Sequence, residues 1–296
     1  MNTDFNYSSV ASIIQAAEKQ SSRFSLVLSQ QAQQMELEEK TVYEKMASNF
    51  QVMKECIEPG CDEHLKSTSG LTGGDAYKLR RYSEEGKSLT GSFLSGALYR
   101  ALAVSELNAS MGRIVAAPTA GSCGILPAAL ITMQVEKGCS DHDCVMALFT
   151  ASAIGMVIAN NASLAGARAD ARQSAGSAAA MAAAGYYRAG RRNPPYGLPG
   201  SCNCLKNILG LVCDPVAGLV EIPCIKRNAS GVAGAFVAAE MALAGIDQVT
   251  IPADEVIWSM KRIGDNYVTY LKRNCRRRTG RHTNRKKASR PGIRSW

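Results

Sequence analysis

Apolar residues recur at helical spacing along most of this chain, and that periodicity limits the folds it can adopt. Val10, Ile13, Ile14 and Ala17 share one helical face, and a second set does the same until Pro59-Gly60 ends the run. No alternating pattern typical of strands is sustained. Further helices are expected over residues 93–108, 125–137, 144–159, 232–244 and 253–272. The sequence predicts an all-α fold, a single compact helical domain (residues 1–272) with glycine-rich loops between helices.

Composition supports this prediction. Hydrophobic residues make up 46% of the chain and aromatic residues only 6%. Such a chain suits closely packed helices of small residues, and it argues against an aromatic-rich β-sandwich or general disorder. The longest apolar stretch, 144–159, is shorter than the ~20 residues that span a bilayer, which favours a buried helix. The N-terminus has no basic segment followed by an apolar one, so we expect a cytoplasmic protein.

The net charge of +9 is concentrated at one end of the chain. Ten basic residues and no acidic residue follow Lys272, so the rest of the chain holds 24 basic and 25 acidic residues. Residues 273–296 are therefore predicted to be a basic tail outside the packed domain. Arguments for a nucleic-acid partner apply to that tail alone, and the body is expected to bind neither nucleic acid nor a membrane.

Two glycine-rich loops stand out among the predicted turns. One covers residues 67–75 and the other residues 118–124, directly before the helix expected at Ile125. A glycine-rich turn at a helix start exposes backbone N–H groups beside the positive end of the helix dipole, which suits a carboxylate or phosphate. Tight helix–helix turns are the alternative interpretation. Neither loop matches a nucleotide-binding pattern.

The segment CDPVAGLVEIPC places Cys213 and Cys224 near proline and glycine turns. Thiolates are the natural ligands of iron–sulfur clusters, although two buried core cysteines would give the same spacing. Structural zinc fits poorly because the short paired spacing of zinc ligands is absent. With ten cysteines and no secretory signal, metal ligands or core residues are more plausible than a disulfide framework.

Four segments resemble the α chain of bacterial iron–sulfur-dependent L-serine dehydratase. They are SGLTGGDAYKL (69–79), PTAGSCGILPAA (118–129), IGMVIANNASLAGA (154–167) and LKNILGLVCDPVAGLVEIPCIKRNASG (205–231). The resemblance covers most of residues 40–272. It implies an all-helical lyase carrying a [4Fe–4S] cluster on three cysteines, with one iron open to substrate and a separate β chain as partner. The implied reaction is β-elimination of water from L-serine, which gives pyruvate and ammonia.

The resemblance also suggests which residues carry this chemistry. Cys213 and Cys224 match two of the three cluster ligands. The substrate is expected to contact the two glycine-rich loops, at Ser69, Gly70, Thr119, Ala120, Gly121 and Ser122. A base must remove the Cα proton. His64 is the histidine nearest to a matching loop and is our candidate for that base, with a solvated or structural role as the alternative.

The chain departs from the family pattern in three places. Where the family has EGGCQAEC, this chain has RADARQSA over residues 168–175, so the third cluster cysteine is replaced by Ala171. Permitted codons for this segment, shifted by one base, encode EGGCQAEC. Similar one-base shifts restore family-like sequence between Tyr186 and Cys204 and again after Lys272. We therefore predict that residues 168–204 are locally aberrant and that this segment and the tail are frame-shifted. A divergent family member is the alternative.

Two other functions remain open at this point. An L-cysteine desulfidase resembles this family and uses related chemistry, although PTAGSCGILPA and the α-chain length favour the serine enzyme. A non-catalytic chain that binds nucleic acid through its arginine-rich tail is the third possibility.

Overall fold

The computed structural model describes residues 7–19, 25–162, 172–190, 199–211, 221–246 and 251–266. Within these ranges every regular element is a helix and no strand occurs, so the predicted all-α fold is confirmed. Cys213, Ala171 and the basic tail lie outside the described residues, as do two stretches of the predicted aberrant segment, 168–171 and 191–198.

The helices follow one another with short connections. The N-terminal half contains α1 (Val10–Lys19), α2 (Ser25–Gln34), α3 (Glu39–Glu55), α4 (Ile57–Gly60), α5 (Asp75–Glu84), α6 (Gly91–Ala109), the 3-10 turn η1 (Ala120–Ser122) and α7 (Ile125–Lys137). The C-terminal half contains α8 (Asp141–Asn161), the π-helical turn η2 (Arg172–Gly176), α9 (Ser177–Gly190), α10 (Pro199–Ile208), α11 (Ile222–Leu243) and α12 (Ala253–Asn266).

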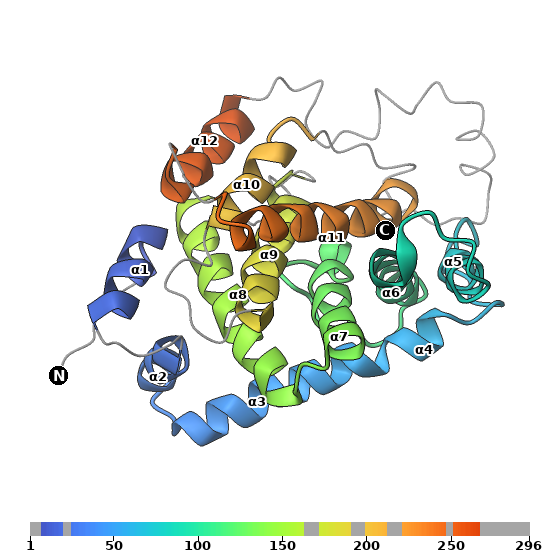
Figure 1. Cartoon of the computed structure of the whole chain (residues 1–296), viewed down its shortest axis with the longest axis horizontal. Coiled ribbons are helices and arrows are strands. Elements are labelled where there is room, and N and C mark those ends of the chain that lie inside the picture. Colours follow the sequence, from blue (N-terminus) through green and yellow to red (C-terminus); the bar gives the residue numbers. More distant parts are fainter. Residues whose placement is uncertain are drawn as a thin grey trace.

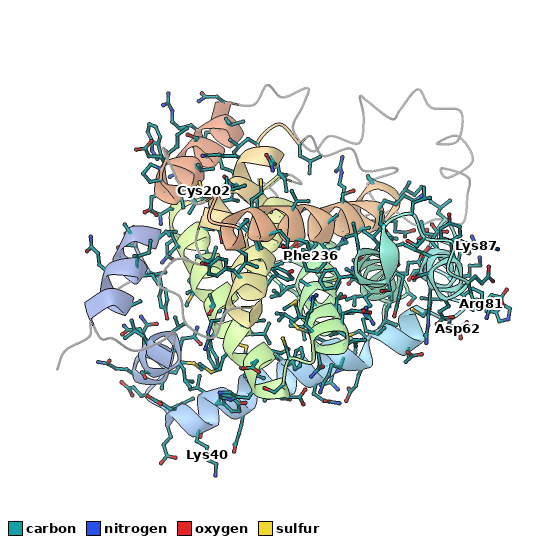
Figure 2. All side chains as sticks on the ribbon, in the orientation of Figure 1. Lys40, Asp62, Arg81, Lys87, Cys202 and Phe236 are labelled. Atoms are coloured by element: carbon teal, nitrogen blue, oxygen red, sulfur yellow. The ribbon has the colours of Figure 1, made fainter. Side chains whose placement is uncertain are left out.

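Three helices, α7, α8 and α9, form the centre of the molecule, and α11 crosses over them (Figure 1). The N-terminal end of α11 lies beside α6, and α5 packs against the other side of α6. Helix α3 runs along the lower edge of the molecule in this view and packs against α8. Helices α1 and α2 also pack against α8. Figure 2 shows Phe236 partway along α11, where it contacts the rings of Phe93 and Tyr186.

Small side chains let these helices approach closely. Helix α9 buries a run of alanines in the core, all at 0% exposure: Ala178, Ala179, Ala180, Ala182, Ala183 and Ala184. Short alanine side chains allow neighbouring backbones to come near while the interior stays densely packed. This packing explains how a chain with few aromatic residues fills its core.

Helix α8 is the buried helix expected from the longest apolar stretch. Ser140 caps it: its side chain accepts a hydrogen bond from the Asp143 backbone N–H, and the Asp143 carboxylate accepts one from the Ser140 N–H. By length and composition α8 is apolar enough to cross a membrane, yet 72% of its apolar window is buried inside the fold. The core therefore accounts for its hydrophobicity.

Helix α11 begins ten residues earlier than the sequence pattern predicted, at Ile222 instead of Val232. Pro223 stands in the first turn, where its fixed φ and missing N–H suit a helix start. Polar residues interrupt the apolar pattern in this part of the helix and hid it. One of them, Asn228, is buried, as is the N-cap residue Glu221, and both make contacts described below.

At Gly124, directly after the η1 turn, the chain lies close against α6. A Cβ atom at this position would lie 2.2 Å from the Ala101 carbonyl oxygen and 2.7 Å from the Ser105 hydroxyl. We expect Gly124→Ala to lower the free energy of unfolding by about 1–3 kcal/mol, because backbone must move to admit the methyl group. Urea denaturation measures the change. Gly234→Ala in α11 is the matched control, since no atom lies within 4 Å of its Cβ position; equal losses in both variants would contradict the account.

Candidate functional site

The candidate site is built around the N-terminal end of α11, which carries Glu221 and Cys224. Glu221 is buried, and its Oε2 atom accepts hydrogen bonds from the hydroxyl groups of Ser69, at 2.7 Å, and Thr72, at 3.1 Å. These contacts join residues about 150 positions apart in the sequence. They fasten the first predicted loop to the helix that presents a predicted cluster ligand.

The first loop, residues 67–74, is also bonded internally. The Ser69 hydroxyl accepts a hydrogen bond from the Leu71 N–H and lies 3.2 Å from the Ser67 hydroxyl. Gly73 has φ of +131°, and a Cβ there would lie 2.0 Å from the Leu65 carbonyl oxygen, so this position needs glycine. The loop is therefore held in one shape.

A buried carboxylate binds the start of helix α5, directly after the first loop. Glu106 of α6 is 1% exposed and accepts hydrogen bonds from the Asp75 and Ala76 N–H groups at the start of α5. A negative side chain is stabilised at the positive end of a helix. Burial nevertheless raises the pKa of the Glu106 carboxyl, and the backbone hydrogen bonds oppose that shift.

Asn228 fastens the second loop to the same helix. This side chain is 1% exposed, and its Oδ1 atom accepts a hydrogen bond from the Gly124 N–H at 2.9 Å. Its Nδ2 atom donates to the carbonyl oxygens of Gly121, at 2.9 Å, and Cys224, at 2.8 Å. Both N–H donors and the carbonyl oxygen of the amide are thus used, and they fix the η1 turn against the first turns of α11.

The η1 turn also contacts the segment that follows the predicted third ligand position. The Thr119 hydroxyl lies 3.1 Å from the Ser122 hydroxyl and 3.1 Å from the hydroxyl of Ser174 in η2. Ser174 is three residues beyond Ala171 in the sequence. The segments 67–74, 119–124, 172–176 and 221–228 thus converge on one region of the fold.

The structure places the predicted site residues as follows. Ser69, Thr119 and Gly121 are half-buried, Ser122 is fully buried, and Gly70 and Ala120 are exposed. All six belong to the two loops that α11 holds together. Cys224 is half-buried in the first turn of α11, whereas Cys213 lies outside the described residues. His64 is exposed on the turn before the first loop, and its backbone N–H donates to the Asp62 carboxylate at 2.6 Å.

Several of the remaining cysteines behave as core residues. Burial raises the pKa of the Cys123 and Cys204 thiols to about 12, and those of Cys56 and Cys61 to about 11. Burial favours the protonated form of these four thiols, as expected of cysteines that pack in a core. Among the described residues, no group of three or more His, Cys, Asp and Glu side chains is arranged to hold a metal ion.

Sequence reasoning missed Glu221, Asn228 and Glu106 as residues that organise the site. Glu221 and Asn228 lie inside the quoted segment 205–231, and a polar residue within an otherwise helical, largely apolar stretch was the available signal. Glu106 carried a similar signal as the single acidic residue in the apolar stretch of α6. In each case the partner lies far away in the sequence, so the pairing itself could be seen only in the structure.

An all-helical domain in which the start of one helix binds two glycine-rich loops is a scaffold suited to a small anionic or zwitterionic substrate. Comparison with known proteins identifies the class. Residues 9–274 match the family described as "Serine dehydratase alpha chain". The chain belongs to this family.

Three relatives illustrate the similarity. A probable L-serine dehydratase, alpha chain, from Bacillus subtilis is 46% identical over 244 residues, 81% of each chain. The L-serine dehydratase alpha chain of Peptoniphilus asaccharolyticus is 38% identical over 250 residues, covering 84% of this chain and 85% of the relative. An L-serine dehydratase of Streptomyces coelicolor is 34% identical over 245 residues, covering 81% of this chain but 53% of the longer relative.

Asn228 gives a direct test of how the two loops are held. We expect Asn228→Ala to lower the free energy of unfolding by about 1–3 kcal/mol, because the buried Gly124 N–H and Gly121 carbonyl lose their partner. Amide hydrogen exchange at Gly124 should accelerate more than exchange within α7. Asn266→Ala, which removes one exposed hydrogen bond to the Arg262 carbonyl, is the control. The account is wrong if both variants lose the same stability.

Proposed function

We propose that this chain is the α chain of an L-serine dehydratase, a lyase that converts L-serine to pyruvate and ammonia. The observation that carries the proposal is the convergence of both predicted substrate loops on the start of α11, beside Cys224. The names of the relatives support the same substrate. No feature of the described residues favours an L-cysteine desulfidase or a nucleic-acid-binding function.

The η1 turn offers donors for the substrate carboxylate. The N–H groups of Ser122, Cys123 and Gly124 already donate within the fold. The N–H groups of Ala120 and Gly121 have no acceptor among the described residues and lie at the exposed side of the turn. Two adjacent N–H groups of this kind suit a carboxylate. We assign substrate-carboxylate binding to this pair, with Thr119 and Ser122 holding the turn in shape.

The base that removes the Cα proton is assigned to His64 on position alone. Its imidazole is exposed, and the backbone of its turn contacts the first loop through Leu65 and Gly73. A base must reach the substrate proton within hydrogen-bond distance or through one water molecule. In the chain that carries EGGCQAEC over residues 168–175, His64→Gln should therefore lower kcat for pyruvate formation from L-serine much more than it raises KM.

The family's [4Fe–4S] cluster would supply a Lewis-acidic iron that assists departure of the substrate hydroxyl. The donor set of this chain does not fit that cluster as written. Cys213 and Cys224 supply two thiolates, and the position of the third family ligand is Ala171, whose methyl group binds no iron.

A separate β chain is the proposed partner, because the relatives in Bacillus subtilis and Peptoniphilus asaccharolyticus are named as α chains. The longer Streptomyces coelicolor relative is named without a chain designation, and the matched segment covers 53% of its length. Assays of the proposed activity should accordingly be run with a β chain from a related bacterium as well as with this chain alone.

The missing third ligand leads to a graded prediction. After anaerobic reconstitution with a β chain present, the chain as written should hold fewer than four irons and form little pyruvate from L-serine. Ala171→Cys should recover part of both, and replacing residues 168–175 by EGGCQAEC should recover more, because the neighbouring Arg168, Asp170 and Arg172 would also be removed. Iron and sulfide content and pyruvate formation are the measurements.

Two results would contradict this account. Four-iron clusters and full activity in the chain as written would show that another residue replaces the missing cysteine. Release of sulfide from L-cysteine at a higher kcat/KM than pyruvate from L-serine, in the EGGCQAEC variant, would show that the substrate assignment is wrong.

A further inference from the structure

We propose that Glu221 binds the ammonium group of the amino-acid substrate. This inference rests on the proposed function and adds a substrate contact to the same site. It draws on the burial of Glu221, its hydrogen bonds and the charges around it.

One carboxylate oxygen of Glu221 accepts hydrogen bonds from the first loop, and the other accepts none from the described residues. The Oε2 atom accepts from the hydroxyl groups of Ser69 and Thr72. The Oε1 atom accepts no hydrogen bond from any described residue, and the side chain as a whole is 6% exposed. A carboxylate in this state has one oxygen fixed in direction and one oxygen available to a ligand.

No cationic side chain neutralises this carboxylate among the described residues. The nearest cation along the chain, Lys226, points its Nζ atom toward the Asp75 carboxylate at 4.0 Å instead. The positive end of α11 stabilises the Glu221 charge in part, because Glu221 occupies the N-cap. A mostly buried negative charge without a cation costs free energy, and a ligand that brings its own positive charge lowers that cost.

Ser69 is less suited to this contact than Glu221. Its single hydroxyl proton is donated to Glu221, while its oxygen accepts from the Leu71 N–H and lies within hydrogen-bond distance of the Ser67 hydroxyl. A serine hydroxyl has one donor and two acceptor positions, so its capacity is used within the loop. Ser69 and Thr72 therefore act as positioning residues that aim Glu221.

The position of Glu221 agrees with the rest of the proposed site. Glu221 and Cys224 are the N-cap and third residue of α11, a spacing that places them on neighbouring parts of one helix end. Asn228, one turn further along, holds the η1 turn whose Ala120 and Gly121 N–H groups are assigned to the substrate carboxylate. The two charged groups on Cα of the amino acid would thus be bound separately, the ammonium by Glu221 and the carboxylate by the two backbone N–H groups.

The experiment compares two ligands that differ in the ammonium group. L-Serine and 3-hydroxypropanoate are titrated calorimetrically into the full chain, the Glu221→Gln variant and the Glu255→Gln variant. Glu255 is exposed on α12, far from the site, and its substitution makes the same chemical change. In the unaltered chain and in Glu255→Gln, we expect L-serine to bind at least tenfold more tightly than 3-hydroxypropanoate. In Glu221→Gln we expect that ratio to fall close to one.

A ratio that stays unchanged in Glu221→Gln would overturn this inference and leave the proposed function standing. Failure of the unaltered chain to bind L-serine at all would overturn both. If Glu221→Gln does not fold, as judged by circular dichroism, Glu221→Asp replaces it. The shorter side chain withdraws the carboxylate, so the ratio should again fall, and an undiminished ratio would overturn the inference in the same way.

Discussion

The site depends on one helix end whose polar side chains are buried. Glu221 and Asn228 lie within two turns of each other at the start of α11, and each bonds to a loop from a distant part of the sequence. Without partners, these buried groups would each cost a desolvation penalty of about 1–3 kcal/mol or more. Because the loops supply those partners, the burial of α11 and the shape of both loops are coupled.

Close packing of small residues makes that coupling possible. The η1 turn approaches α6 so nearly that Gly124 leaves no room for a Cβ, and the alanines of α9 allow α11 to lie directly over the centre of the fold. Glu106 adds a second constraint from α6 by binding the first N–H groups of α5. The two loops are therefore fixed by contacts with both α6 and α11. These contacts favour a site that is formed before the ligand binds.

The sequence predicted the helical class and most long helices because their apolar residues recur at helical spacing. Helices α2 and α5, which are rich in polar residues, were missed, as were α9 and α10, which lie largely in the segment predicted to be aberrant. Helix α11 was placed ten residues late because Lys226, Arg227 and Asn228 interrupt its apolar pattern. The two glycine-rich loops could be found from composition, and the structure shows that they converge. The roles of Glu221, Asn228 and Glu106 could not be predicted, because each is defined by a contact with a residue that is remote in sequence. The role of Cys213 and the consequences of Ala171 stay predictions, since both residues lie outside the described part of the chain.

The central claim is that this chain binds L-serine between the two loops at the start of α11. Amide hydrogen exchange with and without saturating L-serine tests it most directly, because it reports binding at residue level whether or not the chain turns over. The account predicts slower exchange in residues 67–74, 119–125 and 221–228, with no change in α12. Protection confined to other helices, or an exchange pattern that L-serine leaves unaltered, would contradict it.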